Sequence, residues 1–191
     1  MENEIWDISA ENKVKIDKDI ANFIIEQGEK SLKYSIEVAD KTTSKSITLL
    51  LIFLPVTSTI VGFLINSVKQ SKTLISAETM LLIYLLVVCV VALIFVVKLI
   101  LPRDTMAVGR EPRQLAVDQV LQLPDCSNEK KLMIYKLNEI KNFQHKIDYN
   151  RKQNDSRILL FKRILIYIGL TAILGLIFYI LIVYLSAVQL L

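Results

Sequence analysis

Three long apolar stretches constrain this chain more than any other feature: residues 47–68, 80–101 and 164–191. Each holds about twenty or more mostly apolar residues, and a helix of that length rises about 30 Å, the thickness of a bilayer's hydrocarbon core. A soluble domain does not concentrate a 53% hydrophobic composition in three such blocks. The stretches therefore predict three transmembrane helices.

The lysines and arginines around these stretches predict how the chain is oriented. The segment 98–163 carries 14 basic residues, whereas the connector 69–79 carries two. Loops rich in Lys and Arg stay on the cytoplasmic side of a membrane. We therefore expect a multi-pass plasma-membrane protein with a cytoplasmic N-terminus and an external C-terminus.

The predicted fold class is an all-α membrane protein, in which two long cytoplasmic helical extensions accompany the three transmembrane helices. We also expect several copies to assemble into a homo-oligomeric helical bundle. The segments are a cytoplasmic amphipathic helix (1–46), transmembrane helices 1 and 2 (47–101), a basic cytoplasmic helical segment (102–163) and transmembrane helix 3 (164–191).

The N-terminal extension shows a helical repeat. Small and apolar residues recur at intervals of three and four from Ile16 to Thr43, through Ile20 and Ile24, which marks one helical face. The pattern predicts a single helix from about 11 to 68. Gly28 is its expected weak point, because glycine costs about 1 kcal/mol relative to alanine in a helix.

The second extension begins with a loop over 103–110 and a short helix over about 111–122. A long helix then starts near Glu129 and continues into the third span. Its seam residues are spaced close to a heptad, which predicts packing on the first extension or on copies of itself. The seam consists of Ile140, Phe143, Ile147, Asn150, Asn154, Ile158 and Phe161.

One face of the first span is unusually polar. Polar groups in hydrocarbon cost free energy unless they find partners, so we expect this face to turn away from lipid. Two interpretations stay open: the face packs against other helices, or copies of it line a water-filled pore. The pore-lining candidates are Thr48, Pro55, Thr59, Gly62 and Asn66.

A polar and basic cluster precedes the third span. The asparagines fit a polar pair that sets coiled-coil register, and the basic residues fit contact with anionic lipid headgroups. The alternative is a binding site for a nucleotide, an oligonucleotide or an acidic protein. The ligand- or partner-binding candidates are Asn150, Arg151, Lys152, Asn154 and Arg157.

No group of residues suggests catalysis. His145 is the only histidine, the two cysteines lack metal-ligand spacing, and no Gly-rich phosphate loop or nucleophile motif occurs. We therefore expect no enzyme activity, no metal and no cofactor. The spans also contain no Asp or Glu, which argues against an ion-coupled transporter.

The layout resembles a known class of bacterial proteins. A long helix with the step Ala39-Asp40-Lys41 before the first span, and the stretch 146–157 (KIDYNRKQNDSR), are similar to small transmembrane effectors of nucleotide-signalling anti-phage defence. These are the Pycsar- and CBASS-like transmembrane effectors and the SLATT-like modules. The third span departs from two-span modules of this kind.

The resemblance implies a bacterial inner-membrane effector that oligomerises into a gated ion channel or pore and depolarises the membrane. Its expected partners are membrane lipid, further copies of itself, and a nucleotide, an oligonucleotide or a nucleotidyltransferase on the cytoplasmic side. One alternative is a non-conducting anchor that recruits a soluble partner through the basic helix. Another is a small membrane protein that neutralises a different membrane protein.

Overall fold

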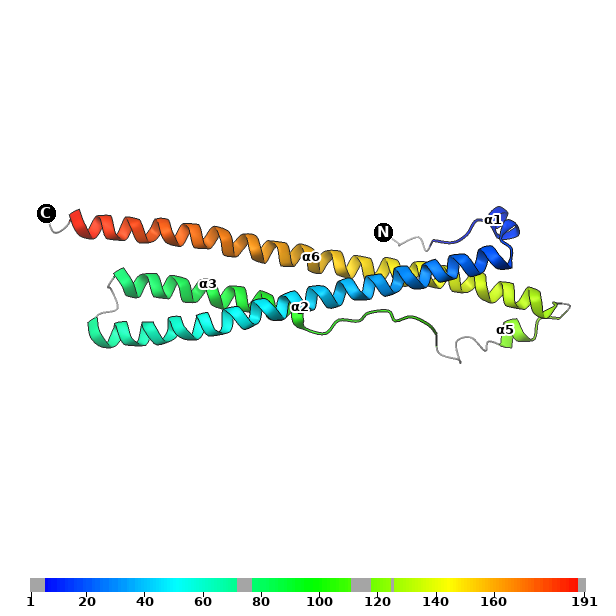
Figure 1. Cartoon of the computed structure of the whole chain (residues 1–191), viewed down its shortest axis with the longest axis horizontal. Helices are drawn as coiled ribbons and strands as arrows, with labels where there is room; N and C mark the ends of the chain where they lie inside the picture. The colour runs from blue at the N-terminus through cyan, green and yellow to red at the C-terminus, as the bar shows by residue number, and fades with distance from the viewer. Residues whose placement is uncertain (1–5, 72–76, 111–117, 125, 189–191) are drawn as a thin grey trace. The chain divides into compact units, whose positions relative to one another are not determined.

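A computed structural model describes residues 6–71, 77–110, 118–124 and 126–188. The described residues contain no β-strand, and three of the helices, α2, α3 and α6, are long and apolar enough to cross a membrane. The all-helical class and the three candidate spans are thereby confirmed. The helices are α1 (Ala10–Lys15), α2 (Lys18–Ser71), α3 (Ala77–Ile100), α5 (Asp118–Leu121) and α6 (Asn128–Val188) (Figure 1).

The prediction of one helix from residue 11 to 68 is wrong at its N-terminal end. The helix breaks after α1, and Asp17 caps α2. The Asp17 Oδ1 atom accepts hydrogen bonds from the backbone N–H groups of Asp19 (3.0 Å) and Ile20 (2.8 Å). Such a side chain satisfies donors that lack a partner in the first helical turn, so a new helix starts there.

The later elements agree better with the sequence. Residues 103–110 form a loop, and α6 begins at Asn128 and continues without interruption to Val188. Of the predicted short helix over 111–122, the structure has α5 near its end, whereas residues 111–117 lie outside the described residues.

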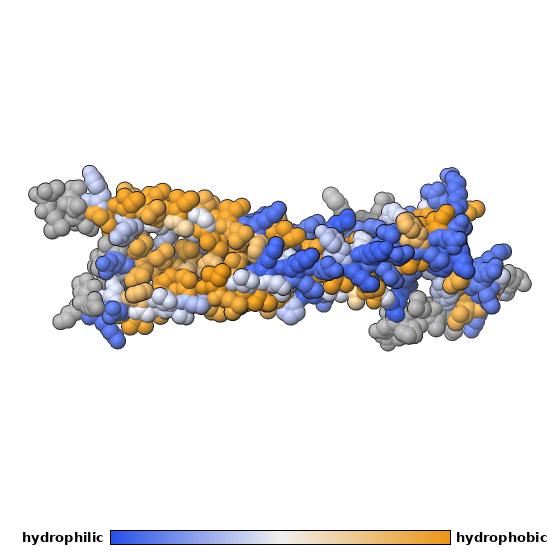
Figure 2. Space-filling model, viewed as in Figure 1, coloured by the Kyte–Doolittle hydropathy of each residue, from blue (hydrophilic) through white to orange (hydrophobic). Residues whose placement is uncertain are grey.

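The chain divides into two compact units, and both α2 and α6 pass from one unit into the other. Unit 1 comprises residues 1–40 and 103–155, and unit 2 comprises residues 41–102 and 156–191. Polar side chains dominate the visible surface of unit 1, and apolar side chains that of unit 2 (Figure 2). Most of the predicted segment 1–46 thus shares a unit with most of 102–163.

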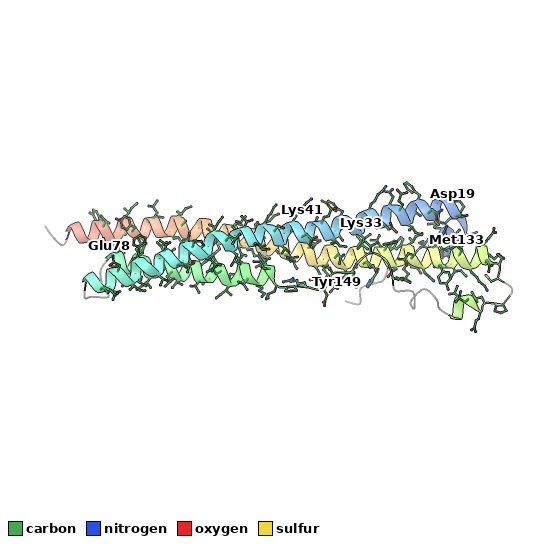
Figure 3. The ribbon with its side chains drawn as sticks, turned by 60° about the horizontal axis from the view of Figure 1, so that its bottom comes forward. Asp19, Lys33, Lys41, Glu78, Met133 and Tyr149 are labelled. Carbon is green, nitrogen blue, oxygen red and sulfur yellow. The ribbon has the colours of Figure 1, made fainter. Side chains whose placement is uncertain are left out.

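In unit 1, α2 and α6 lie side by side and run parallel. Lys136 Nζ donates to Asn22 Oδ1 at 2.6 Å, and Asn150 Nδ2 donates to Ser35 Oγ at 3.1 Å, so residue numbers rise together along both helices. Asp19 and Met133 accordingly lie at the same end of this unit (Figure 3).

The apolar core of unit 1 consists of Leu32, Phe143 and Ile147, with Ile25 packed against it. A Cβ atom on Gly28 would lie 3.2 Å from both Cβ and Cγ of Phe143. Gly28 therefore lets α2 approach this ring closely. The helix continues through Gly28 without interruption, and the sequence did not reveal this packing role.

The face of α2 that is buried differs from the predicted one by about one residue. Ile20 is exposed, whereas Ala21 is fully buried. The predicted and the buried positions coincide only from Gly28 onward, at Gly28, Leu32 and Ala39. The residues that face α6 alternate in steps of four and three, the heptad spacing of coiled coils: Ala21, Ile25, Gly28, Leu32, Ser35 and Ala39.

Acid is expected to release the segment before α1 from α6. Asp7 Oδ2 lies 3.2 Å from Lys13 Nζ and 3.4 Å from Lys141 Nζ, and these contacts, Lys13 first, hold the pKa of Asp7 below its ordinary value. The pKa of a free aspartate is about 4, and the pKa of Asp7 in the folded protein is lower. Above about pH 4 the charged carboxylate stabilises the contact, and this stabilisation is lost as the pH falls through the pKa of the folded protein.

The fluorescence of Trp6, the only tryptophan, should therefore change on acidification below about pH 4. The variant Asp7→Asn should lack that step, and an identical titration of both proteins would contradict the tether.

Unit 2 is a three-helix bundle. Its core contains Val96, Leu99 and Ile164. The Tyr84 hydroxyl donates to the Thr171 carbonyl at 2.8 Å, while Leu99 packs near Ile164, so α3 runs antiparallel to α6. Near the end of α2 and the start of α3, the hydroxyls of Ser67 and Thr79 lie 3.0 Å apart, so these two helices lie side by side and run antiparallel.

Candidate functional site

The polar face of the first span is exposed in unit 2. All five pore-lining candidates are exposed, and nothing lies within 4 Å of the position where a Cβ on Gly62 would be. The helix packs through its other side, where Ile60 is buried and Thr57 is half-buried. Thr57 precedes Thr59 by two residues, a turn of about 200° around a helix. Thr59 and Gly62 therefore lie on the side of α2 that turns away from α3 and α6 of the same chain.

The hydroxyls on this face are satisfied within α2. Thr48 Oγ1 donates to the Ser44 carbonyl at 3.1 Å, and Thr59 Oγ1 donates to the Pro55 carbonyl at 2.9 Å. Such bonds reduce the cost of placing a hydroxyl in an apolar environment. The hydroxyl oxygens keep lone pairs that can accept further hydrogen bonds from water or from another helix.

One member of the face borders a small cavity between α2 and α3. Asn66 lines a space of about 290 Å³ together with residues of both helices. Glu78, at the start of α3, supplies its one carboxylate. The remaining lining residues are Phe63, Ser67, Leu81 and Leu82.

In unit 1, Asn150 and Asn154 are buried and hydrogen-bonded within the chain. Asn150 is 2% exposed; its Oδ1 accepts from the Met106 N–H at 3.0 Å, and its Nδ2 donates to the Met106 carbonyl at 3.0 Å. Asn154 Nδ2 donates to the Ser35 carbonyl at 2.6 Å. These bonds fix the parallel register of α2 and α6, as a buried asparagine does in a coiled coil. A ligand would have to displace them.

The loop 103–110 is held against α6 by Lys146 and Arg110, which are not among the predicted binding candidates. Lys146 Nζ donates to the carbonyls of Ala107 (2.9 Å) and Gly109, and Arg110 Nε lies 3.1 Å from Glu139 Oε2. Gly109 has φ +85°, a conformation that glycine adopts without steric cost. Only the contact of Asn150 with this loop involves a predicted site residue.

Removal of the Asn150 amide is expected to release this loop. In Asn150→Ala, the half-buried Met106 backbone loses both of its bonds to the amide, at a cost of about 1–3 kcal/mol. Trypsin should then cleave after Arg103, in the same loop, roughly 5- to 150-fold faster than in the parent protein. Lys152→Ala, two positions away on the exposed side of α6, serves as the control and should leave this rate unchanged. Equal cleavage rates in Asn150→Ala and the parent would show that the loop is held elsewhere.

In unit 2, Arg157 is buried at the end of α3. It is 6% exposed, and its Nη2 donates to Thr43 Oγ1 at 2.6 Å and to the Leu99 carbonyl at 2.8 Å. The carbonyls of a last helical turn lack helical partners and attract cations. Arg157 therefore joins α2, α3 and α6. The predicted seam was wrong at this point, because Arg157 is buried, whereas Ile158 is only half-buried.

Of the five ligand candidates, Arg151 and Lys152 alone are exposed. They follow Asn150 directly and therefore lie on other sides of α6 from its buried seam. The predicted cluster thus separates into three buried residues that join helices and two accessible cations.

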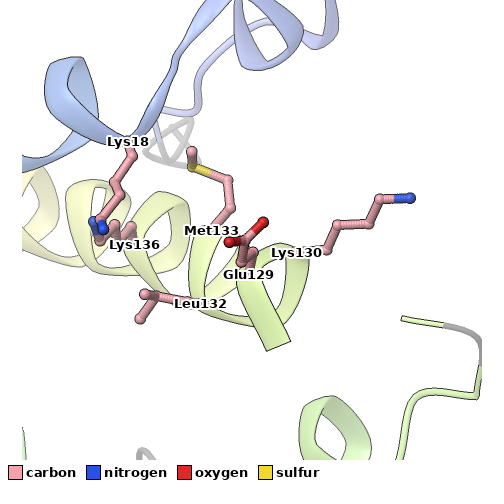
Figure 4. A pocket seen from close by; sticks show the side chains of 6 residues that line it. All are labelled: Lys18, Glu129, Lys130, Leu132, Met133 and Lys136. Carbon is pink, nitrogen blue, oxygen red and sulfur yellow. The ribbon is translucent and has the colours of Figure 1, made fainter. Parts of the chain in front are cut away.

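A groove near the N-terminal ends of α2 and α6 was not predicted. It has a volume of about 420 Å³, lies within unit 1 and combines three lysines with one carboxylate over two apolar side chains (Figure 4). The excess of ammonium groups suits an anionic ligand better than a cation. No sequence motif marked it, because its residues come from both extensions: Lys18, Glu129, Lys130, Leu132, Met133 and Lys136.

Among the described residues, no cluster of three or more His, Cys, Asp or Glu side chains could hold a metal ion. Comparison of the chain with protein families, curated proteins and solved structures finds no match.

Proposed function

We propose that this protein is a membrane effector that assembles into a homo-oligomeric, gated ion channel of the bacterial inner membrane. A cytoplasmic nucleotide signal or a partner protein controls it, and its opening depolarises the membrane in anti-phage defence. The defence role rests on the resemblance to nucleotide-signalling effectors, and the channel rests on the residues of α2.

The observation that carries the channel proposal is the exposed polar face of α2 in unit 2. A single copy in a membrane would expose Thr59 and Gly62 on the apolar surface of unit 2, where they face lipid. A ring of copies removes these residues from lipid and places them around water. Conducting pores are lined by polar or charged groups that can replace part of the hydration of an ion.

Control from the cytoplasm is supported by the accessible cations of unit 1. Arg151 and Lys152 are exposed, and the groove around Lys18 and Lys136 carries more ammonium groups than carboxylates. Phosphate groups pair strongly with such side chains. A nucleotide or an acidic protein could therefore bind this unit without breaking the buried asparagine bonds.

The alternative is a non-conducting anchor that recruits a soluble partner. The exposure of Arg151 and Lys152 supports this anchor as much as it supports the channel. A partner could bind these cations while the spans only hold the protein in the membrane. In that case the phenotype would depend on these two cations and not on the polar face of α2.

Ion flux in liposomes tests the proposal. The full chain is purified, its oligomer mass is determined in detergent, and flux is measured with and without added nucleotides. Flux from a homo-oligomer, constitutive or nucleotide-dependent, is the expected result. Sealed liposomes under all of these conditions, or a monomeric protein, would contradict the channel and favour the anchor.

A further inference from the structure

Unit 2 has a highly asymmetric charge distribution. It contains eight Lys or Arg residues but one acidic residue, Glu78. The acidic residues next to its boundaries in sequence, Asp40, Asp104 and Asp155, belong to unit 1. The basic residues of unit 2 therefore receive little compensation from their own bundle.

Six of these basic residues lie at one end of the bundle. Arg157 of α6 contacts both Thr43 of α2 and the Leu99 carbonyl of α3. The three helices therefore meet at this end of unit 2. Glu78 lies at the opposite end from Lys41 (Figure 3). The six are Lys41, Lys45, Lys98, Arg157, Lys162 and Arg163.

Five of the six are exposed, and Lys41 among them takes part in an interaction within the chain. We call the other four the collar: Lys45, Lys98, Lys162 and Arg163. No described residue forms a hydrogen bond or an ion pair with their charged groups. Each lies within three residues of an end of one of the three apolar stretches, near the place where the apolar surface of unit 2 begins. Long basic side chains in such a place extend to the headgroup level of a membrane.

We propose that the collar binds the phosphate groups of anionic phospholipids. The three helices supply cations from several directions, the apolar surface next to them accommodates acyl chains, and no carboxylate of the same unit competes at this end. Each cation near an anionic membrane surface contributes about 1 kcal/mol, or about fivefold in affinity. The proposal is independent of channel activity and requires only that unit 2 lies in a bilayer.

Lipid retention measured by native mass spectrometry tests the collar. The full-length protein is purified in neutral detergent with equal amounts of phosphatidylglycerol and phosphatidylcholine. The parent should retain phosphatidylglycerol at least tenfold more often. The quadruple variant K45Q/K98Q/K162Q/R163Q should lose most of this preference, whereas K45R/K98R/K162R should keep it and show that the positive charge is what matters. Equal retention of both lipids by the parent would overturn the proposal.

A matched pair of single variants separates position from charge. Lys45→Gln and Lys69→Gln each remove one exposed cation from α2, at opposite ends of the first span. Only Lys45→Gln should reduce the preference, by about fivefold. Equal effects would mean that the preference follows overall charge and not the collar. Displacement of the lipid by excess free glycerol phosphate would instead identify a site for soluble anions and would also overturn the proposal.

Discussion

Replacement of Thr59 by leucine is expected to abolish ion flux through the reconstituted protein without changing its oligomer mass. Thr59 is exposed on α2, and its hydroxyl donates to the Pro55 carbonyl of the same helix. Leucine is a better helix former than threonine, so the span should remain intact. In a ring of copies, however, each leucine adds apolar bulk to the pore, and an apolar constriction excludes water and ions. Flux should fall to the level of empty liposomes, and Asn66→Leu should have the same effect.

Two controls make this result specific. Thr59→Ser keeps the hydroxyl and should conduct as the parent does. Leu54→Phe adds bulk at a position that is 48% exposed but about 140° around α2 from Thr59, since it lies five residues away. It should leave flux intact. If Leu54→Phe blocked flux and Thr59→Leu did not, a different face of α2 would line the pore.

Replacement of Phe143 by alanine is expected to lower the free energy of unfolding of unit 1 more than the substitution Asn150→Ala. Phe143 is 3% exposed, packs with Leu32 and Ile147, and contacts the backbone of α2 at Gly28. No side chain at Gly28 can fill the space left by the ring. A Phe→Ala change in a packed core costs about 3–5 kcal/mol. Hydrogen exchange of the α2 amides in unit 1 should then accelerate by roughly two to three orders of magnitude.

The matched control is Phe23→Ala, which removes the same side chain from α2 at a position that is 62% exposed. An exposed substitution of this kind usually changes stability by less than about 0.5 kcal/mol. Hydrogen exchange in this variant should therefore resemble that of the parent. Comparable acceleration in both variants would indicate that unit 1 is not held together by the packing around Phe143.

The sequence predicted the secondary structure well because hydrophobic length and helical periodicity are local properties. Three apolar stretches required three long helices, and the heptad from Ile140 to Asn154 identified the buried seam of α6. The errors occurred where a single residue decides the geometry. Asp17 starts a new helix through its side-chain bonds, and Arg157 replaces Ile158 in the seam because its guanidinium reaches the Leu99 carbonyl.

The candidate sites were predicted as residue types on helical faces, and the sequence could not tell which face meets another helix. Asn150 and Asn154 could equally have bound a ligand; the tertiary structure buries them against Ser35 and the loop. The polar face of α2 could equally have packed on α3; the structure leaves it exposed.

The sequence by itself thus determined the helices, their length and the charge of each segment, since each of these depends on residues close together in the chain. Only the tertiary structure decided that α2 and α6 run parallel in register, that the loop 103–110 attaches to α6, and that cations from three helices gather at one end of unit 2. The bonds that join these parts include pairs 44, 58 and 115 positions apart in the chain, and packing alone brings such residues together.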